Sequence, residues 1–180
     1  TVPLMNGTFR AGYGEHGPAQ LLELPYKGQE LAMLILLPAE GKTLAELEGA
    51  LTSEWLDEAV RTVGYREVRI TLPRWSTRRA LQLKKPLMEM GMVNAFTEKA
   101  DFSAMGGDPG ELYISHVIHQ AFVDVDEQGT EAAAATAVVI RERGMPRPPQ
   151  VFRADHPFVY MIRDRQSGEI LFLGRLADPR

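Results

Sequence analysis

The sequence predicts an α+β fold, in which several strands and a few short helices share a hydrophobic core. Two kinds of periodicity lead to this prediction. Some segments alternate apolar and polar residues or run continuously apolar, as strands do, and others repeat apolar residues every three or four positions, as helices do. The chain has 180 residues, 44% of them hydrophobic, which suffices for one domain with a buried core or for a piece of a larger one.

Strand signals occur along most of the chain. Residues 19–38 are apolar and are interrupted by Pro and Gly, which predicts a hairpin. Residues 67–73 alternate strictly, as expected for a strand with one exposed face. Residues 113–125 are rich in β-branched and aromatic residues, and residues 158–173 surround a turn at 165–168. We expect a strand and a second hairpin there.

Helical spacing appears in two places. Between residues 43 and 63 the apolar positions fit one or two short helices, with Thr43 or Thr52 as N-cap. Residues 81–90 again have helical spacing and stop at Gly91, a residue that suits the left-handed conformation at a helix end.

The composition excludes several classes of protein. A formal charge of -4 and a pI near 5.6 argue against nucleic-acid binding, which needs a basic face. The sequence contains no cysteine, so disulfides, thiolate catalysis and cysteine zinc sites are excluded. The longest apolar run, 31–37, is far shorter than the roughly 20 residues of a membrane span. We expect no cofactor and no membrane partner.

Three patterns that could indicate chemistry lack the required context. Residues 12–17 match the letters of a dinucleotide-binding fingerprint, but Pro18 and a strand signal follow where a helix should begin, so we interpret 7–17 as a glycine-rich loop. His116 and His119 would point to opposite faces of a strand and are not expected to bind a metal. The sequence has no nucleophile elbow, and we predict no catalytic centre.

The unusual segment is 127–140, which contains four successive alanines followed by β-branched residues. Alanine favours helix and the β-branched residues favour extended backbone, so this segment is conformationally ambivalent. Residues 141–153 are rich in arginine and proline, which keeps them extended and accessible to a protease. From composition alone, an exposed helix or linker explains 127–140 as well as an insertion role does, and a solvated basic loop is the better explanation of the arginine cluster after it.

The sequence of residues 127–137, EQGTEAAAATA, resembles the hinge of the reactive loop of the serpins, a family of serine protease inhibitors. Further blocks resemble serpin signatures in the same order along the chain: 1–5 (TVPLM), 22–28 (LELPYKG), 72–75 (LPRW), 87–96 (LMEMGMVNAF), 100–103 (ADFS), 152–158 (FRADHPF) and 171–175 (LFLGR). The resemblance implies the C-terminal part of a serpin fold, with strands of the B- and C-sheets, strands 5 and 6 of the main sheet, and a reactive loop at about 127–150.

The resemblance also implies site residues. The hinge would comprise Glu127, Gly129, Thr130, Ala132, Ala133, Ala134 and Ala135. In the family the residue before the cleaved bond lies fourteen positions after the hinge glycine, which gives Arg143 and a bond to Gly144, with Arg141 and Met145 as alternatives. An arginine there implies a trypsin-like protease as partner, because a buried aspartate in such a protease pairs with the guanidinium. His119 falls where the family has a histidine that controls sheet opening.

The implied activity is suicide-substrate inhibition, in which the cut loop inserts into the main sheet. Serpin loop insertion is one of the standard examples of stored strain released by cleavage. A non-inhibitory serpin with a carrier, chaperone or storage role, or an inactive fragment, is the alternative. Because the family's N-terminal portion is not in residues 1–180, we expect this partial domain to need that portion for activity and for stable folding. The resemblance favours secretion.

Overall fold

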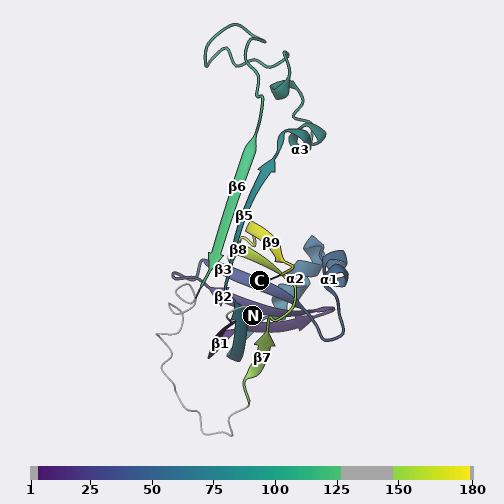
Figure 1. Cartoon of the computed structure of the whole chain (residues 1–180), viewed down its shortest axis with the longest axis vertical. Coiled ribbons are helices and arrows are strands. Elements are labelled where there is room, and N and C mark those ends of the chain that lie inside the picture. The colour runs from purple at the N-terminus through teal and green to yellow at the C-terminus, as the bar shows by residue number, and fades with distance from the viewer. Residues whose placement is uncertain (1–3, 127–147, 179–180) are drawn as a thin grey trace. The chain divides into compact units, whose positions relative to one another are not determined.

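The computed structural model describes residues 4–126 and 148–178, and it divides them into two compact units (Figure 1). The larger unit contains the residues up to Trp75 and those from Val125 onward, and the smaller unit contains Ser76–Asp124. Each unit combines strands with short helices. The predicted α+β class is therefore confirmed.

A seven-stranded sheet is the framework of the larger unit. The strands follow the order β7-β4-β1-β2-β3-β8-β9. Their bounds are β1 (Leu4–His16), β2 (Ala19–Pro25), β3 (Leu31–Pro38), β4 (Gly64–Pro73), β7 (Gln150–Arg153), β8 (Phe158–Asp164) and β9 (Ile170–Leu176). Neighbouring strands are antiparallel, except that β7 runs parallel to β4. Both predicted hairpins are present, as β2–β3 and β8–β9.

The core lies where two helices cover one face of the central strands. The helices are α1 (Leu44–Ala50) and α2 (Ser53–Arg61), and each buries one small or apolar residue, Leu47 and Ala59, against β2, β3 and β8. Strand β3 is buried almost along its whole length. A strand covered on both faces has no need for alternation, which explains the continuous apolar run at 31–37.

Both predicted N-caps are confirmed. The Thr43 hydroxyl accepts a hydrogen bond from the Glu46 backbone N–H (3.2 Å), and the Glu46 carboxylate accepts one from the Thr43 N–H (2.8 Å). This reciprocal pair is a capping box. The Thr52 hydroxyl accepts a hydrogen bond from the Trp55 N–H at 3.2 Å. The predicted pair of short helices therefore begins where local chemistry requires.

The prediction of a glycine-rich loop at 7–17 was wrong, because these residues form most of β1. A Cβ atom on Gly12 would lie 2.7 Å from Val63 Cγ1, and one on Gly14 would lie 2.5 Å from the Thr62 hydroxyl oxygen. The two glycines therefore let the end of α2 pack directly on the strand. Since β1 is paired on both edges, the dinucleotide-binding pattern has no turn at which to bind phosphate.

The smaller unit contains the helix α3 (Lys84–Glu89), the short 3₁₀ helix η1 (Asn94–Phe96) and the two-stranded sheet of β5 (Trp75–Gln82) and β6 (Ile118–Val125), except for the end residues Trp75 and Val125. Two predicted boundaries were wrong here. The helix predicted for 81–90 begins only at Lys84, because the two residues at 81–82 belong to β5. The strand predicted for 113–125 begins at Ile118, because the Ile114 N–H donates to the Ala95 carbonyl (2.9 Å) instead of to a strand. The predicted stop at Gly91 is confirmed by its φ of 102°.

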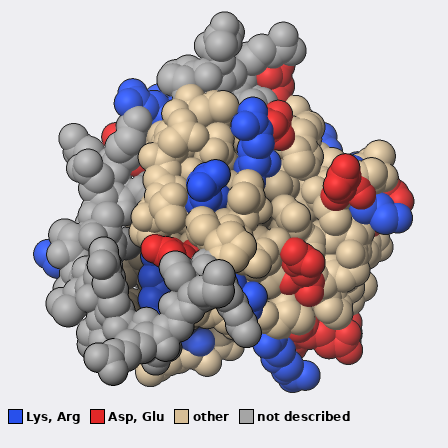
Figure 2. Space-filling view, turned by 90° about the horizontal axis from the view of Figure 1, so that it is seen from below, with Lys and Arg blue, Asp and Glu red and all other residues tan. Residues whose placement is uncertain are grey.

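Charged side chains of both signs are interspersed on the side of the molecule that Figure 2 shows, without a large field of one sign among the described residues. This distribution gives no support to a nucleic-acid interface. No helix in the described ranges is long and apolar enough to cross a membrane.

Candidate reactive-loop site

All but one of the predicted site residues lie outside the described residues. These are the hinge residues Glu127, Gly129, Thr130, Ala132, Ala133, Ala134 and Ala135, the bond between Arg143 and Gly144, and the alternatives Arg141 and Met145. The structure describes the elements on both sides of this segment, β6 before it and β7 after it.

Strand β6 is largely exposed, although it contains several large apolar residues. Within the described residues it pairs only with β5, so its second edge presents free backbone N–H and C=O groups. Ile118 and Phe122 share one face and are 63% and 52% exposed. The guanidinium of Arg78 lies over the Phe122 ring at 5.1 Å, and this cation–π contact partly covers that face. Such a strand is suited to accept a further strand and a covering layer.

His119 is the one predicted site residue that the structure describes. It lies in β6, where its side chain is exposed and has no hydrogen-bond partner among the described residues. It shares a face with Ala121 and Val123, both half-buried. His116 lies before the strand begins, so the predicted opposite-face arrangement of the two histidines in one strand was wrong. Among the described residues, no group of three His, Asp or Glu could hold a metal ion.

The other flank is firmly anchored. Strand β7 pairs in parallel with β4, with Phe152 beside Ile70, and Phe152 is completely buried. The Ala154 N–H continues the attachment by donating to the Thr71 carbonyl at 2.9 Å. Val151, on the opposite face of β7, is 53% exposed. The side chains of this short strand are therefore sharply divided between core and solvent.

A polar chain follows directly after β7. The Asp155 carboxylate contacts the Arg153 guanidinium at 2.5 Å and the His156 ring at 3.0 Å. The second ring nitrogen of His156 lies 3.1 Å from the Pro38 carbonyl oxygen. The hydrogen bond to His156, and then the one to Arg153, hold the pKa of Asp155 below its usual value. These contacts tie the segment after the loop to the end of β3.

Sequence analysis missed a buried polar network in the larger unit. Glu23 is only 5% exposed, accepts a hydrogen bond from the Tyr65 hydroxyl (2.8 Å) and pairs with Arg165 Nε (3.3 Å). Burial, followed by the Glu23 carboxylate, raises the pKa of Tyr65 to about 12. A charged residue inside the apolar run of β2 was the available signal, but its partners are distant in sequence.

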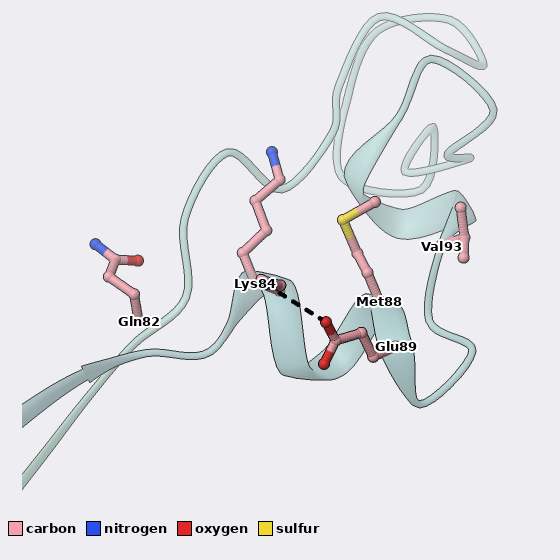
Figure 3. Close-up of a pocket in the computed structure, with 6 residues that line it drawn as sticks. Gln82, Lys84, Met88, Glu89 and Val93 are labelled. Atoms are coloured by element: carbon pink, nitrogen blue, oxygen red, sulfur yellow. Dashed lines mark ion pairs between the residues drawn. The ribbon is translucent and has the colours of Figure 1, made fainter.

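The described part of the smaller unit has an open hollow of about 550 Å³ beside α3 (Figure 3). It is lined by Gln82, Lys84, Lys85, Met88, Glu89 and Val93. Its one ion pair joins Lys85 and Glu89 at 3.8 Å with both side chains exposed. The lining contains no Ser, Thr, Cys or His side chain.

Comparison with known proteins gives a consistent answer. Residues 1–179 match the family model described as Serpin (serine protease inhibitor). An uncharacterised serpin-like protein of Thermococcus kodakarensis is 40% identical over 99% of the chain. The leukocyte elastase inhibitor of Bos taurus is 45% identical over 95% of the chain, and serpin B8 of Bos taurus is 45% identical over 99%.

The solved structure of a tumour-suppressing serpin matches 99% of the chain with a TM-score of 0.77 and 27% identity, and the match covers 47% of that chain. The three relatives named above are covered to 42%, 46% and 49% of their own lengths. The chain therefore spans about half the length of the curated relatives it matches.

Proposed function

Because the chain belongs to the serpin family, we propose that the full-length protein inhibits a trypsin-like serine protease by presenting the segment 127–150 as bait. The observation that carries this proposal is the small-residue hinge, EQGTEAAAATA, placed directly between β6 and β7 in the chain. The Bos taurus relative described above is named as an inhibitor of leukocyte elastase. The proposed role is inhibition and not catalysis.

The proposed mechanism begins when the protease attacks the Arg143 carbonyl carbon and forms an acyl-enzyme, releasing the amine of Gly144. The freed hinge then enters the main sheet as a new strand and carries the protease with it. Residues 130–143 in extended form would measure about 46 Å, at roughly 3.3 Å per residue. Each inserted residue gains ladder hydrogen bonds worth about 1 kcal/mol.

The hinge composition supports insertion. Gly129, Thr130 and the alanines at 132–135 are small, so they can slip between packed strands without clashes. The free edge of β6 supplies a ladder for pairing within the smaller unit. We assign His119 a part in this step, because it lies on β6 with its ring free to bond across to an incoming or departing strand.

Residues 1–180 form, in this proposal, one partial serpin domain that acts together with the remainder of the fold. The exposed apolar residues of β6 would then be covered in the whole protein. The physiological target is a protease that accepts arginine, because its specificity pocket would pair with the guanidinium of Arg143.

The test is incubation of the full-length protein with trypsin, followed by denaturing electrophoresis. We expect a complex between inhibitor and protease that survives SDS. We also expect a released C-terminal peptide whose mass corresponds to a chain that begins at Gly144. A peptide beginning at Glu142 would move the bond to Arg141 without affecting the mechanism, whereas one beginning at Pro146 would place the bond at Met145 and contradict a target that requires arginine. Thr130→Arg should convert the inhibitor into a substrate, with Arg147→Ala as the control outside the hinge.

A non-inhibitory serpin is the alternative function. It predicts cleavage of the loop without complex formation and without a gain in thermal stability of the cleaved protein. Loop insertion predicts the opposite, a sharply higher unfolding temperature after cleavage. Cleavage without complex or stabilisation would refute the inhibitory proposal.

A further inference from the structure

Arg163 is a buried cation, and two of its three guanidinium nitrogens lack hydrogen-bond partners. It lies on β8 between Ala32 of β3 and Ile170 of β9, and it is 9% exposed. Within the described residues, its Nε and Nη1 atoms are buried and have no hydrogen-bond partner. The charge of Arg163 acts on the neighbouring Asp164, whose pKa is lowered first by hydrogen bonds from the Ser167 and Gln166 N–H groups and further by this guanidinium. The two buried N–H groups nevertheless remain without an acceptor, which is unfavourable in a protein interior. The folded protein therefore needs an acceptor at this position.

The nearby carboxylates are already engaged. Glu23 lies on the same face of the sheet as Arg163, because it is opposite Leu34 of β3, which is opposite Met161 of β8, two residues before Arg163. The Glu23 carboxylate is already bound by Tyr65 and Arg165. Asp164 accepts hydrogen bonds from two backbone N–H groups of the β8–β9 turn at 2.7 and 2.8 Å. Glu48 of α1 pairs with Arg175 of β9 at 3.3 Å. The acids of the adjoining turns, Glu30 and Glu169, are exposed.

The surroundings of Arg163 indicate where the acceptor comes from. Strand β9 is the last strand of the sheet, and its outer edge is unpaired in the described part of the chain. On the face of Arg163, Ile170 and Leu173 of β9 are 41% and 60% exposed. The chain spans 42% to 49% of the relatives it matches, so a full-length protein has further polypeptide with which to cover these residues. One segment could cover both the apolar side chains and the buried cation.

We propose that Arg163 is the receptor for a carboxylate on a further segment of the full-length polypeptide, which lies along β9 and places an Asp or Glu against Nε and Nη1. The Arg fork presents parallel N–H donors that match the two oxygens of a carboxylate. The apolar residues of β9 supply the hydrophobic part of this contact, and the ion pair fixes its register. This inference does not depend on inhibitory activity.

The experiment compares variants of the full-length protein by thermal unfolding. Arg163→Met should lower the unfolding midpoint by about 5 °C or more at pH 7.5, because it leaves a buried carboxylate without its cation. The deficit should shrink at pH 5, since an orphaned buried carboxylate takes up a proton. The unfolding midpoint of Arg163→Lys should lie between those of the wild type and Arg163→Met. The matched control Arg175→Met removes an exposed pair and should shift the midpoint by about 1–2 °C at both pH values.

Three outcomes would overturn the proposal. An unchanged or raised midpoint for Arg163→Met would mean that no carboxylate pairs with this residue, since replacing an unpaired buried charge by an apolar side chain is stabilising. A deficit that is the same at pH 5 and 7.5 would indicate lost packing alone. A wild-type midpoint that rises with phosphate concentration, while that of Arg163→Met does not, would assign the position to a small anion.

Discussion

Replacing Phe152 by alanine tests how the segment after the loop is attached. Phe152 is 0% exposed and lies beside Ile70 in the parallel pairing of β7 and β4. Deleting a fully buried phenylalanine costs about 3–5 kcal/mol, which combines lost transfer free energy with the cavity left behind. In urea unfolding of the full-length protein, Phe152→Ala should reduce the free energy of unfolding by this amount.

Val151 provides the matched control on the same strand. Its side chain is 53% exposed on the opposite face, so Val151→Ala should change the unfolding free energy by no more than about 0.5 kcal/mol. A shift of the strand by one residue would exchange the two faces and reverse the order of the two costs. If Val151→Ala proved the more damaging change, the register of β7, and with it the end of the reactive loop, would have to be moved.

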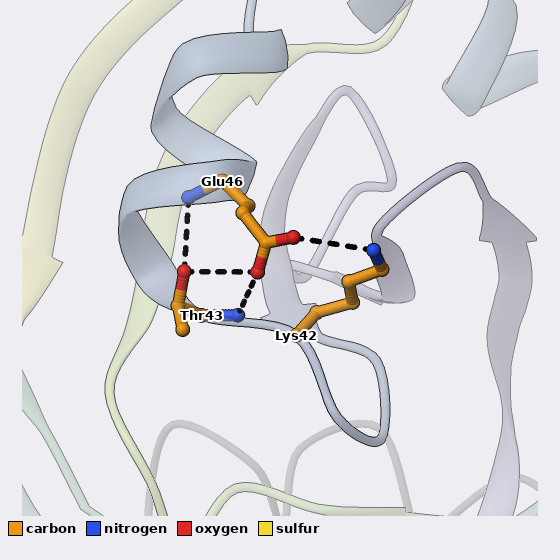
Figure 4. A network of polar contacts seen from close by, with 3 residues as sticks. All are labelled: Lys42, Thr43 and Glu46. Atoms are coloured by element: carbon orange, nitrogen blue, oxygen red, sulfur yellow. Dashed lines mark hydrogen bonds and ion pairs between the residues drawn. The ribbon is translucent and has the colours of Figure 1, made fainter.

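Three further predictions concern caps, charge and glycine. Thr43→Ala removes the capping box of α1 (Figure 4) and should cost about 1 kcal/mol in urea unfolding, and an unchanged midpoint would contradict the cap. Because the pKa of Asp155 is lowered in the folded protein, its contribution to stability is complete above the ordinary value of 3.8 and is lost as the pH falls through the folded-state value. The contribution is under about 1 kcal/mol, since the side chain is 42% exposed. Asp155→Asn should therefore make the unfolding free energy less dependent on pH in this acid range. Gly12→Ala should destabilise by more than about 1 kcal/mol because of the clash with Val63, whereas Gly49→Ala, in open space on α1, should stabilise by about 0.5–1 kcal/mol, and equal effects would refute the packing described here.

The helices and hairpins could be predicted because neighbouring residues decide them. Thr43 and Thr52 mark the starts of the two helices, because each accepts a hydrogen bond from the backbone N–H three residues ahead. Strand β1 could not be predicted in the same way, because Gly12 and Gly14 are explained only by the close approach of α2, which the order of residues does not reveal. The same holds for the start of α3, where pairing of β5 with β6 overrides helical spacing.

The candidate site divides along similar lines. The hinge and Arg143 could be proposed from the sequence because the family motif that they resemble is contiguous, at 127–143, and both stay predictions. The buried pair of Glu23 and Arg165 and the unpaired Arg163 were not found, since their roles depend on which strands lie side by side. The available signal was a charged residue within an apolar strand, but this signal does not identify the residue that pairs with it.

The two flanks of the loop differ in a way that bears on the direction of movement. In the proposed mechanism, the protease would remain attached to the piece that continues from β6, because the acyl bond would be made to the Arg143 carbonyl. The other piece leads into β7, which Phe152 holds in the core. A mechanism that moves the protease needs the detached piece to stay fixed, and the burial of Phe152 agrees with that need. We therefore expect Phe152→Ala to weaken the attachment of the released piece without lowering the yield of covalent complex, whereas a charged residue at Thr130 should lower that yield alone.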